Sequence, residues 1–528
     1  MGKIIGVDLG TTNSCVAVID GGEPLVLPNS EGSRTTPSMV GFTEEGERFV
    51  GQQAKRQAII NPELTIYDIK RLIGHKYNSD QVQKYAEILP YKIVENTNGD
   101  AWVQVDGQRY SPQEISSLIL RKMKQTAEDY FGEEITEAVI TVPAYFNDAQ
   151  RSATKDAGKI AGLTVRRIIN EPTGAALAYG YEETDNANLV VFDLGGGTFD
   201  VSIVQLRGGV FEVVGTAGDN HLGGEDFDRA VLDFLMDRFE ADTGIDVSDD
   251  NMALQRLKEA AENAKCELSS TSETNINLPF LAVDDSGPRH LSLDLSRSQL
   301  NDLVYDLVDR LADPCELALE EAGLSKSDLD DVLLVGGMTR MPLVQERVEE
   351  IFERKPHKGV NPDEVVAKGA AIQSGILGGE VKEVILLDIT PFSLGIRVSG
   401  DRFSPIISKN TPVPTVETKV FTTTEDNQDV VTVTVLQGED EVASNNKLLG
   451  MFNLTGIDPA PAGKPRIEVS FEIDTDGIVD VSAKDLSTDA SQSITVEGHS
   501  GLSDEELQRA MQRSEDAQES SAAVVESE

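Results

Sequence analysis

The stretch "LVVFDLGGGTFDVSIVQL" (residues 189–206) decides the fold of this chain. Two apolar segments of β-strand composition flank Asp193, three successive glycines and Asp200. Glycine weakens a strand interior, and a buried unpaired carboxylate is costly, so the break predicts a tight turn with a chemical role. Such a turn offers backbone N–H groups and hydroxyls to an anion, and carboxylates to the metal that accompanies it.

A second stretch repeats this plan near the N-terminus. "IIGVDLGTTNSCVAVID" (4–20) also places Asp-Leu-Gly and a Gly/Thr turn between two apolar strands. Two copies predict two related lobes that face each other. A third glycine turn, in "DVLLVGGMTRMPLVQERVEEIF" (331–352), follows an apolar strand, and we expect it to open a helix whose N-terminus is a phosphate site.

Helix signals surround these turns. In "SPQEISSLILRKMKQTAEDYFG" (111–132), Ser111 is a candidate cap with Pro112 at the first helical position, Glu114 three residues on and Gly132 at the end. We also expect a strand in 137–146, a helix ending at Gly162 in 147–162, and a helix in 254–270. That last helix places Glu262, Lys265 and Ser269 along one face, which by itself is more typical of a solvated stripe.

The composition excludes several classes of function. The 528 residues carry 46 Lys+Arg against 91 Asp+Glu, a net charge of −45, which argues against nucleic acid and anionic membranes as partners. The three cysteines form no disulfide framework or CxxC pattern. The N-terminus lacks a signal-peptide pattern, and no apolar run approaches ~18 residues, so we expect a soluble cytoplasmic protein.

The pattern changes after residue 380. Segment 381–391 is short and apolar between charges, and 392–498 has the period-two alternation of a β-sandwich, with a hairpin turn at Asp476-Gly477. Ser503 and Glu506 form a capping box that starts a final helix. We expect this helix to stop by about residue 518 and the acidic end "ESSAAVVESE" to be disordered.

The sequence does not support the two common alternative nucleotide-binding folds. The chain contains neither G-x-x-x-x-G-K-[ST] nor G-x-G-x-x-G, so a P-loop and a dinucleotide fold are disfavoured. A single glycine turn could be purely structural, but the second hairpin and the "LVGGMTR" turn make that interpretation weak.

The motifs resemble those of the DnaK family of heat-shock protein 70 chaperones. The resemblance runs from residue 3 to about 515 and rests on these stretches in family order: "VDLGTTNS", "VPAYFNDAQR", "INEPTGAALAYG", "FDLGGGTFD", "GDNHLGGEDFD", "VGGMTR", "VNPDEVVAKGAA" and "EVILLDITP". It implies an actin-like two-lobed α/β ATPase domain (1–380), a linker (381–391), a β-sandwich peptide-binding domain (392–498), and a short C-terminal helix with an acidic tail (499–528).

The resemblance also implies a site for ATP or ADP with Mg²⁺ and K⁺. Residues expected to bind nucleotide are Thr11, Thr12, Asn13, Gly196, Gly197, Gly223, Gly224, Glu262, Lys265, Ser269, Gly336, Gly337, Arg340 and Asp363. Asp8, Asp193 and Asp200 are the expected cation ligands, and Lys70, Glu171, Asp193 and Thr198 are expected around the attacking water. Phosphoryl transfer needs positioning and charge stabilisation, and either Asp193 or Glu171 could accept the water proton.

The β-sandwich resembles the peptide-binding domain of the family. Its expected peptide-binding positions are Ile396, Val398, Ser399, Phe421, Thr424, Val431 and Val433. The apolar ones could equally be ordinary sandwich core. Ser399 and Thr424 replace the usual apolar pair over the peptide, and Arg402 stands near a usual apolar position, so only a preference for extended apolar segments is predicted.

The resemblance further implies communication between the domains. The expected relay and linker residues are Pro143, Arg151, Arg167, Asn170, Thr173, Val384, Leu386, Leu387 and Asp388. Implied partners are unfolded client polypeptides, a J-domain co-chaperone and a GrpE-type exchange factor. Two alternatives stay open: an actin-like or sugar-kinase-like enzyme, and a regulatory co-chaperone that binds ATP but barely hydrolyses it. Intact Lys70, Glu171, Asp193 and Thr198 argue against the second.

Several features depart from the family pattern. Gly174 replaces a usual alanine, which predicts a looser helix start, and Met338 replaces a polar residue. Cys15 and Cys266 fall beside the nucleotide motifs, where buried structural thiols are expected. The helical lid of the family is missing after the final helix, which predicts fast peptide release even with ADP. The acidity could also reflect a high-salt cytoplasm.

Overall fold

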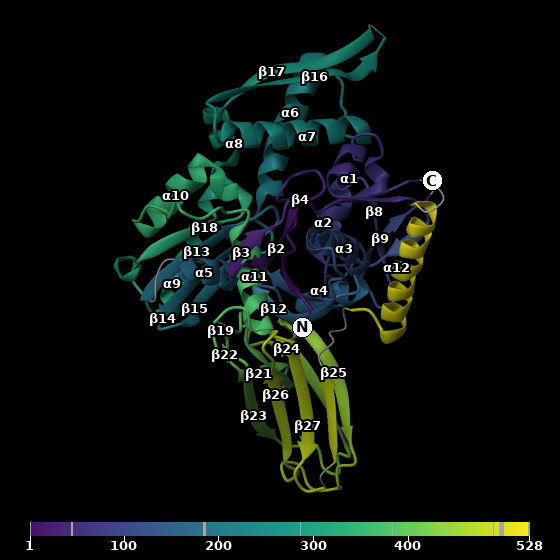
Figure 1. Ribbon diagram of the computed structural model, residues 1–528. Helices are drawn as coiled ribbons and strands as arrows, with labels where there is room; N and C mark the ends of the chain where they lie inside the picture. The colour runs from purple at the N-terminus through teal and green to yellow at the C-terminus, as the bar shows by residue number, and fades with distance from the viewer. Residues whose placement is uncertain are drawn as a thin grey trace.

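Two α/β lobes lie side by side, with a β-sandwich below them and a final helix along one lobe (Figure 1). The computed structural model describes residues 2–43, 46–182, 186–285, 287–382, 384–488, 490–495 and 501–525. None of the helices within these ranges is both long and apolar enough to cross a membrane.

Each lobe is built on a sheet that contains one of the two predicted hairpins. The lobe I sheet has the order β12 (Thr164–Asn170), β11 (Glu137–Val142), β1 (Ile4–Asp8), β2 (Asn13–Asp20), β3 (Glu23–Val26), with β4 (Thr36–Pro37) beside β2. The lobe II sheet has the order β18 (Asp331–Val335), β13 (Asn186–Leu194), β14 (Phe199–Arg207), β15 (Val210–Asp219), β19 (Ile385–Ile389), β22 (Pro412–Val413). In both, an antiparallel hairpin continues into a third strand on one side and pairs with a parallel strand on the other.

The remaining elements complete the two lobes, partly as smaller separate sheets. Lobe I adds β5 (Val40–Phe42), β6 (Arg48–Val50), β7 (Thr65–Ile66), β8 (Lys92–Glu95), β9 (Ala101–Val105), β10 (Gln108–Tyr110), α1 (Gln52–Gln57), α2 (Asp80–Ile88), α3 (Pro112–Phe131) and α4 (Asp148–Ile160). Lobe II adds α5 (Glu171–Glu182), α6 (Gly224–Thr243), α7 (Asn251–Leu268), β16 (Glu273–Asp284), β17 (Gly287–Ser296), α8 (Arg297–Asp309), α9 (Ala312–Ala322) and α10 (Pro342–Phe352). The last helix before the linker, α11 (Val365–Gly378), packs against α5 and against β1, β2, β3 and β11 of the lobe I sheet.

The predicted cap of α3 is confirmed. The Ser111 hydroxyl accepts from the Glu114 N–H, the Glu114 carboxylate accepts from the Ser111 N–H, and Pro112 is the first helical residue. Gly132 ends the helix in the left-handed region at φ 69°, where glycine bears no Cβ penalty. The strand expected in 137–146 is β11, and α4 occupies the segment expected to end at Gly162.

Two glycines explain how α5 and α11 pack closely beneath the cleft. A Cβ added to Gly369 would lie 1.9 Å from the Gly174 carbonyl oxygen. A Cβ on Gly174 would in turn lie 3.3 Å from the Val366 carbonyl oxygen. Gly174 therefore lies close to the backbone of α11, and the looser helix start expected from the sequence stays a prediction.

The third glycine turn differs from the prediction. Gly337–Arg340 forms a short 3₁₀ helix, and α10 begins only at Pro342. The expectation that the turn itself opens a long helix is wrong, because Pro342 suits the first position of α10 and Met341 separates it from the turn.

The C-terminal β-layers form a sandwich of two four-stranded sheets. One sheet has the order β21 (Arg402–Ile407), β20 (Leu394–Val398), β24 (Val430–Gln437), β25 (Lys447–Thr455), and the other has the order β23 (Thr415–Phe421), β26 (Ile467–Ile473), β27 (Val479–Asp485), β28 (Ser491–Thr495). The hairpin turn predicted at Asp476-Gly477 joins β26 to β27, with Gly477 at φ 78°.

The linker segment is a strand of the lobe II sheet. β19 runs parallel to β15, and its other edge pairs with β22, which precedes the first strand of the second sandwich sheet. One hydrogen-bonded sheet therefore passes from lobe II through the linker to the sandwich.

The sandwich also rests directly on lobe I. The Asp476 carboxylate accepts from the Ile168 N–H at 2.9 Å and pairs with Lys155 Nζ at 2.5 Å. The Asp148 carboxylate accepts from the Val479 N–H at 2.8 Å. These contacts bury charged groups of both parts in one interface.

The final helix α12 (Asp504–Val525) packs along lobe I (Figure 1). Its capping box at Ser503 and Glu506 is confirmed. Arg513 pairs with Glu114 at 2.6 Å, and the Ser514 hydroxyl donates to the Ile160 carbonyl oxygen. The prediction that the helix stops by about residue 518 is wrong, because α12 continues to Val525. The segment up to that residue is therefore helical rather than disordered, and residues 526–528 lie outside the described ranges.

Candidate active site

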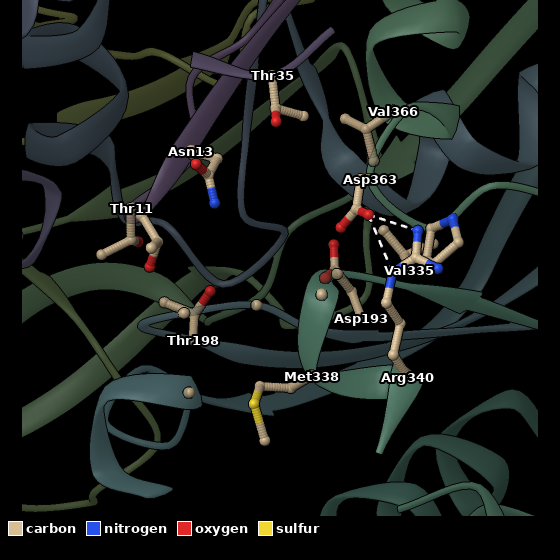
Figure 2. A pocket seen from close by; sticks show the side chains of 18 of the residues that line it. Thr11, Asn13, Thr35, Asp193, Thr198, Val335, Met338, Arg340, Asp363 and Val366 are labelled. Atoms are coloured by element: carbon tan, nitrogen blue, oxygen red, sulfur yellow. Dashed lines mark hydrogen bonds and ion pairs between the residues drawn. The ribbon is translucent and has the colours of Figure 1, made fainter. Parts of the chain in front are cut away.

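A cavity of about 350 Å³ lies between the two lobes (Figure 2). It is lined by most of the residues predicted to bind nucleotide, cation and water: Asp8, Thr11, Thr12, Asn13, Lys70, Glu171, Asp193, Gly196, Thr198, Gly224, Glu262, Lys265, Ser269, Gly336, Gly337, Arg340 and Asp363. Thr11 and Asn13 from lobe I face Met338 and Arg340 from lobe II across the opening.

The two hairpin turns meet at the inner end of the cavity. A Cβ added to Gly196 would lie 1.8 Å from the Thr12 hydroxyl, so only glycine allows this approach. Thr12 Oγ1 is buried and has no hydrogen-bond partner among the described residues. The glycine turn of lobe II can offer backbone N–H groups, and the Thr12 side chain of lobe I offers an unpaired hydroxyl. Both kinds of donor suit a ligand rich in anionic oxygens.

Four carboxylates share this inner end with one lysine. Asp193 and Asp200 are opposite each other in the β13–β14 pair, and Lys70 Nζ lies 2.8 Å from Glu171. Burial, followed by the charge of Glu171, raises the pKa of Asp8 and of Asp200 to about 7, and raises that of Asp193 well above its ordinary value. The cluster therefore lacks positive charge.

This lack of positive charge suits a hard metal cation that is coordinated partly by water and by the phosphates of a bound nucleotide. Within the described part of the chain, no three His, Cys, Asp or Glu side chains form a group that could hold a metal alone. Mg²⁺ keeps several waters and is bound through one or two carboxylates plus substrate phosphates, so Asp8 and Asp193 fit that role. Bound there, the ion would neutralise charge on the phosphates.

The outer end of the cavity is formed by α7 and the 3₁₀ turn. Lys265 Nζ lies 2.8 Å from Asp228 and donates to the Gly224 carbonyl oxygen at 3.2 Å. Burial opposes charge on Lys265, but Asp228 outweighs it, and the pKa of Lys265 is raised. Opposite, Arg340 pairs with Asp363 at 2.5 Å (Figure 2). The face of α7 that carries Glu262 and Lys265, with Ser269 at its C-terminal end, therefore lines the cavity and is not a solvent-exposed row of polar side chains.

Three predicted residues lie behind the cavity wall. A Cβ on Gly223 would lie 2.6 Å from the carbonyl carbon and oxygen of Gly196, so Gly223 supports the turn from behind. Gly197 lies against Thr11. Asp200 is buried, accepts from the Tyr145 N–H at 3.2 Å and has its other oxygen unpaired among the described residues.

Several residues that line the cavity were not predicted: Gly10, Thr35, Gly195, Asp228, Val335, Met341, Pro362 and Val366. Asp228 ends the quoted "GDNHLGGEDFD" stretch, so its signal was present, whereas Thr35 stands in a segment without a motif. Cys15 is buried as expected, but Cys266 is exposed and lines the cavity, so the expectation of a buried thiol is wrong there.

Ion pairs between the lobes close the upper part of the cleft. Lys55 on α1 lies 2.7 Å from Glu262 on α7. Lys258 on α7 lies 3.0 Å from Glu225 and 3.7 Å from Asp68 of lobe I. Opening the cleft would break the Lys55–Glu262 and Lys258–Asp68 contacts, whereas the Lys258–Glu225 pair lies within lobe II.

Several of the residues predicted to relay signals lie at the interface with the linker and the sandwich. Arg151 is buried and donates to the Asn170 side chain at 2.7 Å, and the Thr173 hydroxyl donates to Asp388 of β19 at 2.5 Å. Leu386 is buried, and Val384 and Leu387 are partly buried. Pro143 accepts from the Phe146 N–H, and Arg167 pairs with Val139 in the lobe I sheet.

The predicted peptide-binding side chains separate into three groups. Ile396 and Val433 are buried in the core between the sandwich sheets. Val398, Phe421 and Val431 are partly exposed and pack against that core. Ser399 and Thr424 are exposed outside the strands, as is Arg402 at the start of β21.

Comparison with known protein families decides the class. The family described as "Hsp70 protein" matches residues 4–528. The chain belongs to the Hsp70 family. Hsp70 proteins are ATP-dependent chaperones with a two-lobed, actin-like ATPase and a substrate-binding domain, and the two α/β lobes and the β-sandwich of this chain are consistent with that organisation. Hsp70 proteins bind ATP and ADP with Mg²⁺, and they generally bind client polypeptides and co-chaperones.

Proposed function

We propose that this Hsp70 is a DnaK-type chaperone in which ATP hydrolysis in the cleft controls how the β-sandwich binds extended apolar segments of unfolded proteins. The observation that carries this proposal is β19, because it pairs with β15 of lobe II and with β22, next to the sandwich, at once. A change in the lobes therefore acts on the sandwich through a strand rather than a loose tether. The boundaries at residues 380, 391 and 498 belong to this proposal.

Lys70, Glu171, Asp193 and Thr198 carry the hydrolysis. Glu171 is held by Lys70, so we assign Glu171 to positioning the lysine, whose charge faces the transferring phosphoryl group. Asp193 and Thr198 line the same end of the cavity, and we assign to them the orientation of the attacking water. Asp8 and Asp200 are the proposed K⁺ ligands.

The predicted nucleotide residues keep their proposed roles. The hairpin and Gly223–Gly224 turns face the phosphates, whereas Glu262, Lys265, Ser269, Arg340 and Asp363 surround adenosine. The partly exposed Val398, Phe421 and Val431 form the proposed peptide site, with Ile396 and Val433 beneath them. These side chains are apolar and lie at the edge of a sheet core, which suits an extended segment.

The co-chaperones follow from the same interface. We assign a J-domain partner to the region of Arg167, Asn170, Thr173 and Asp388, because a partner there would bear directly on the linker strand. A GrpE-type exchange factor is the proposed second partner. The three cysteines are free, which fits a reducing cytoplasm.

Single-turnover ATP hydrolysis with and without an extended apolar peptide tests the proposal. We expect peptide to change the hydrolysis rate and ATP to speed peptide release. Leu386→Asp, which places a charge at a buried linker position, should retain hydrolysis and lose both responses. Transfer of phosphate to a small molecule instead of water, or hydrolysis indifferent to every peptide, would contradict it.

A further inference from the structure

Arg71 belongs to lobe I but makes its closest charged contact with lobe II. It follows Lys70 in the 3₁₀ helix Ile69–Arg71, and its side chain is only 7% exposed. It does not line the ATP cavity directly. Its contacts therefore need an explanation of their own.

One nitrogen of Arg71 reaches both phosphate-facing turns of lobe II. Nη2 donates to the Gly196 carbonyl oxygen at 3.3 Å and to Asp226 Oδ2 at 3.0 Å. The same Asp226 oxygen accepts from the Gly223 N–H at 2.8 Å. Arg71 thus holds the hairpin turn directly and the Gly223 turn through Asp226.

The two turns are themselves joined by backbone bonds. The Gly224 N–H donates to the Gly195 carbonyl oxygen at 2.9 Å, and the Glu225 N–H donates to the Gly196 carbonyl oxygen at 2.9 Å. Because Gly196 and Gly224 line the cavity, a shift of either turn would move the N–H groups that face the phosphates. Arg71 fixes this pair of turns to lobe I.

Tyr85 of lobe I fixes the orientation of the Arg71 guanidinium group. Nη1 donates to the Tyr85 hydroxyl at 2.9 Å, and the guanidinium carbon lies 5.3 Å from the centre of the Tyr85 ring. A planar fork can hold the tyrosine, the aspartate and the carbonyl together, whereas a lysine ammonium has no such fixed geometry.

One nitrogen of the Arg71 side chain lacks a hydrogen-bond partner among the described residues. This nitrogen, Nε, is buried, and a Cβ on Gly197 would lie 2.9 Å from it. A buried unpaired donor is costly. The close approach of this nitrogen to the hairpin turn is thus better explained by placement of the turn than by stability.

We propose that Arg71 is a positioning residue for phosphoryl transfer: it clamps the Gly196–Gly197 and Gly223–Gly224 turns of lobe II against lobe I, next to Lys70. The inference rests on the proposed function of the cleft and deepens it. Arg71 acts through the two turns rather than by touching the phosphates.

The test uses the full chain with Arg71→Lys and Asp226→Asn. Arg71→Lys keeps the charge near Asp226 but loses the fork, so we expect single-turnover hydrolysis at saturating ATP to fall about 10²-fold, while ATP affinity changes far less. Asp226→Asn should lower the same rate in the same direction. Lys55→Ala is the matched control, because its pair with Glu262 joins the lobes away from the phosphate turns. It should speed ADP release and leave the saturating rate unchanged.

The outcomes separate the possibilities. If Arg71→Lys and Asp226→Asn hydrolyse saturating ATP like the wild type and only release nucleotide faster, as Lys55→Ala does, Arg71 is a simple tie between the lobes and the proposal is overturned. Thermal unfolding of each variant shows whether it is folded, and the two conservative variants decide the matter even if Arg71→Ala does not fold. An inactive wild-type chain would contradict the proposed function instead.

Discussion

The cavity between the lobes and the interface between lobe I and the sandwich both bury carboxylates, but the charge of these carboxylates is balanced differently. Asp8 and Asp193 in the cavity, and Asp200 behind its wall, lie near Glu171, and Lys70 is a positive charge close to all three aspartates. At the interface, Asp476 of the sandwich is paired with Lys155 and with the Ile168 N–H of lobe I, while Asp148 accepts the Val479 N–H and keeps one oxygen without a partner among the described residues. The cavity is therefore completed by a ligand from solution, whereas the interface is completed by another part of the same chain.

The largest expected effect concerns the charge balance of the cavity. Lys70→Ala should keep ATP binding but lower hydrolysis by roughly 10²–10³-fold, since it removes a preorganised charge. Single-turnover hydrolysis and ATP titration measure the two quantities. The exposed Lys84→Ala is the control and should behave like the wild type. Unchanged hydrolysis in a folded Lys70→Ala protein would remove Lys70 from the mechanism.

The interface should respond to protons. Burial raises the pKa of Asp148 from its ordinary 3.8 to about 8 when the sandwich is docked, and one of its oxygens has no partner among the described residues. The charged groups around it are Arg151 on α4, Lys447 on β25 and Asp474 in the β26–β27 turn. We therefore expect the docked state to hold a proton on Asp148 more tightly than a state in which undocking exposes this carboxyl group to water.

Docking should therefore weaken as pH rises through the neutral range toward 8, where docked Asp148 loses its proton, and should level off above that pH. A dye pair on lobe I and the sandwich would report the docked fraction from pH 6 to 8. Asp148→Asn keeps an acceptor for the Val479 N–H but cannot ionise, so its docking should vary much less with pH. An equally steep dependence in that variant would assign the proton to another group.

A smaller effect is expected at the linker. Asp388→Ala removes the acceptor of the Thr173 hydroxyl, so basal hydrolysis should stay near normal while stimulation by a J-domain protein is lost. A charge-assisted hydrogen bond is worth about 1.5–3 kcal/mol, enough to uncouple docking from the cleft. Thr173→Val should show a partial loss. Full stimulation of Asp388→Ala would show that the bond does not carry the signal.

The smallest effect should come from the exposed charges. With a net charge of −45, repulsion across the surface should be screened by salt, whereas the buried carboxylates are less affected. We expect the melting temperature to rise in molar KCl, measured by calorimetry against the same molarity of sucrose. A melting temperature that does not rise would argue against adaptation to high salt.

Local patterns predicted the hairpins and caps well. Asp193 with its three glycines and Ser111 with Glu114 act on their own neighbours, so their roles can be deduced from adjacent residues. Non-local contacts were beyond reach: Asp476 looked only like a turn residue, yet it binds Ile168 and Lys155. The period-two pattern cannot separate a core residue such as Val433 from a channel residue, because both point inward.

The pairing of β1 with β11 has a consequence for the synthesis of this protein. β1 (Ile4–Asp8) finds its parallel neighbour only after residue 142 has been made, and α11, which packs against β1, arrives only with residue 378. Such distant pairing makes folding slow and leaves apolar strands exposed on the growing chain. A nascent Hsp70 of this kind is thus itself a long-lived unfolded polypeptide, and it should be among the first proteins to benefit from the chaperones already present in the cell.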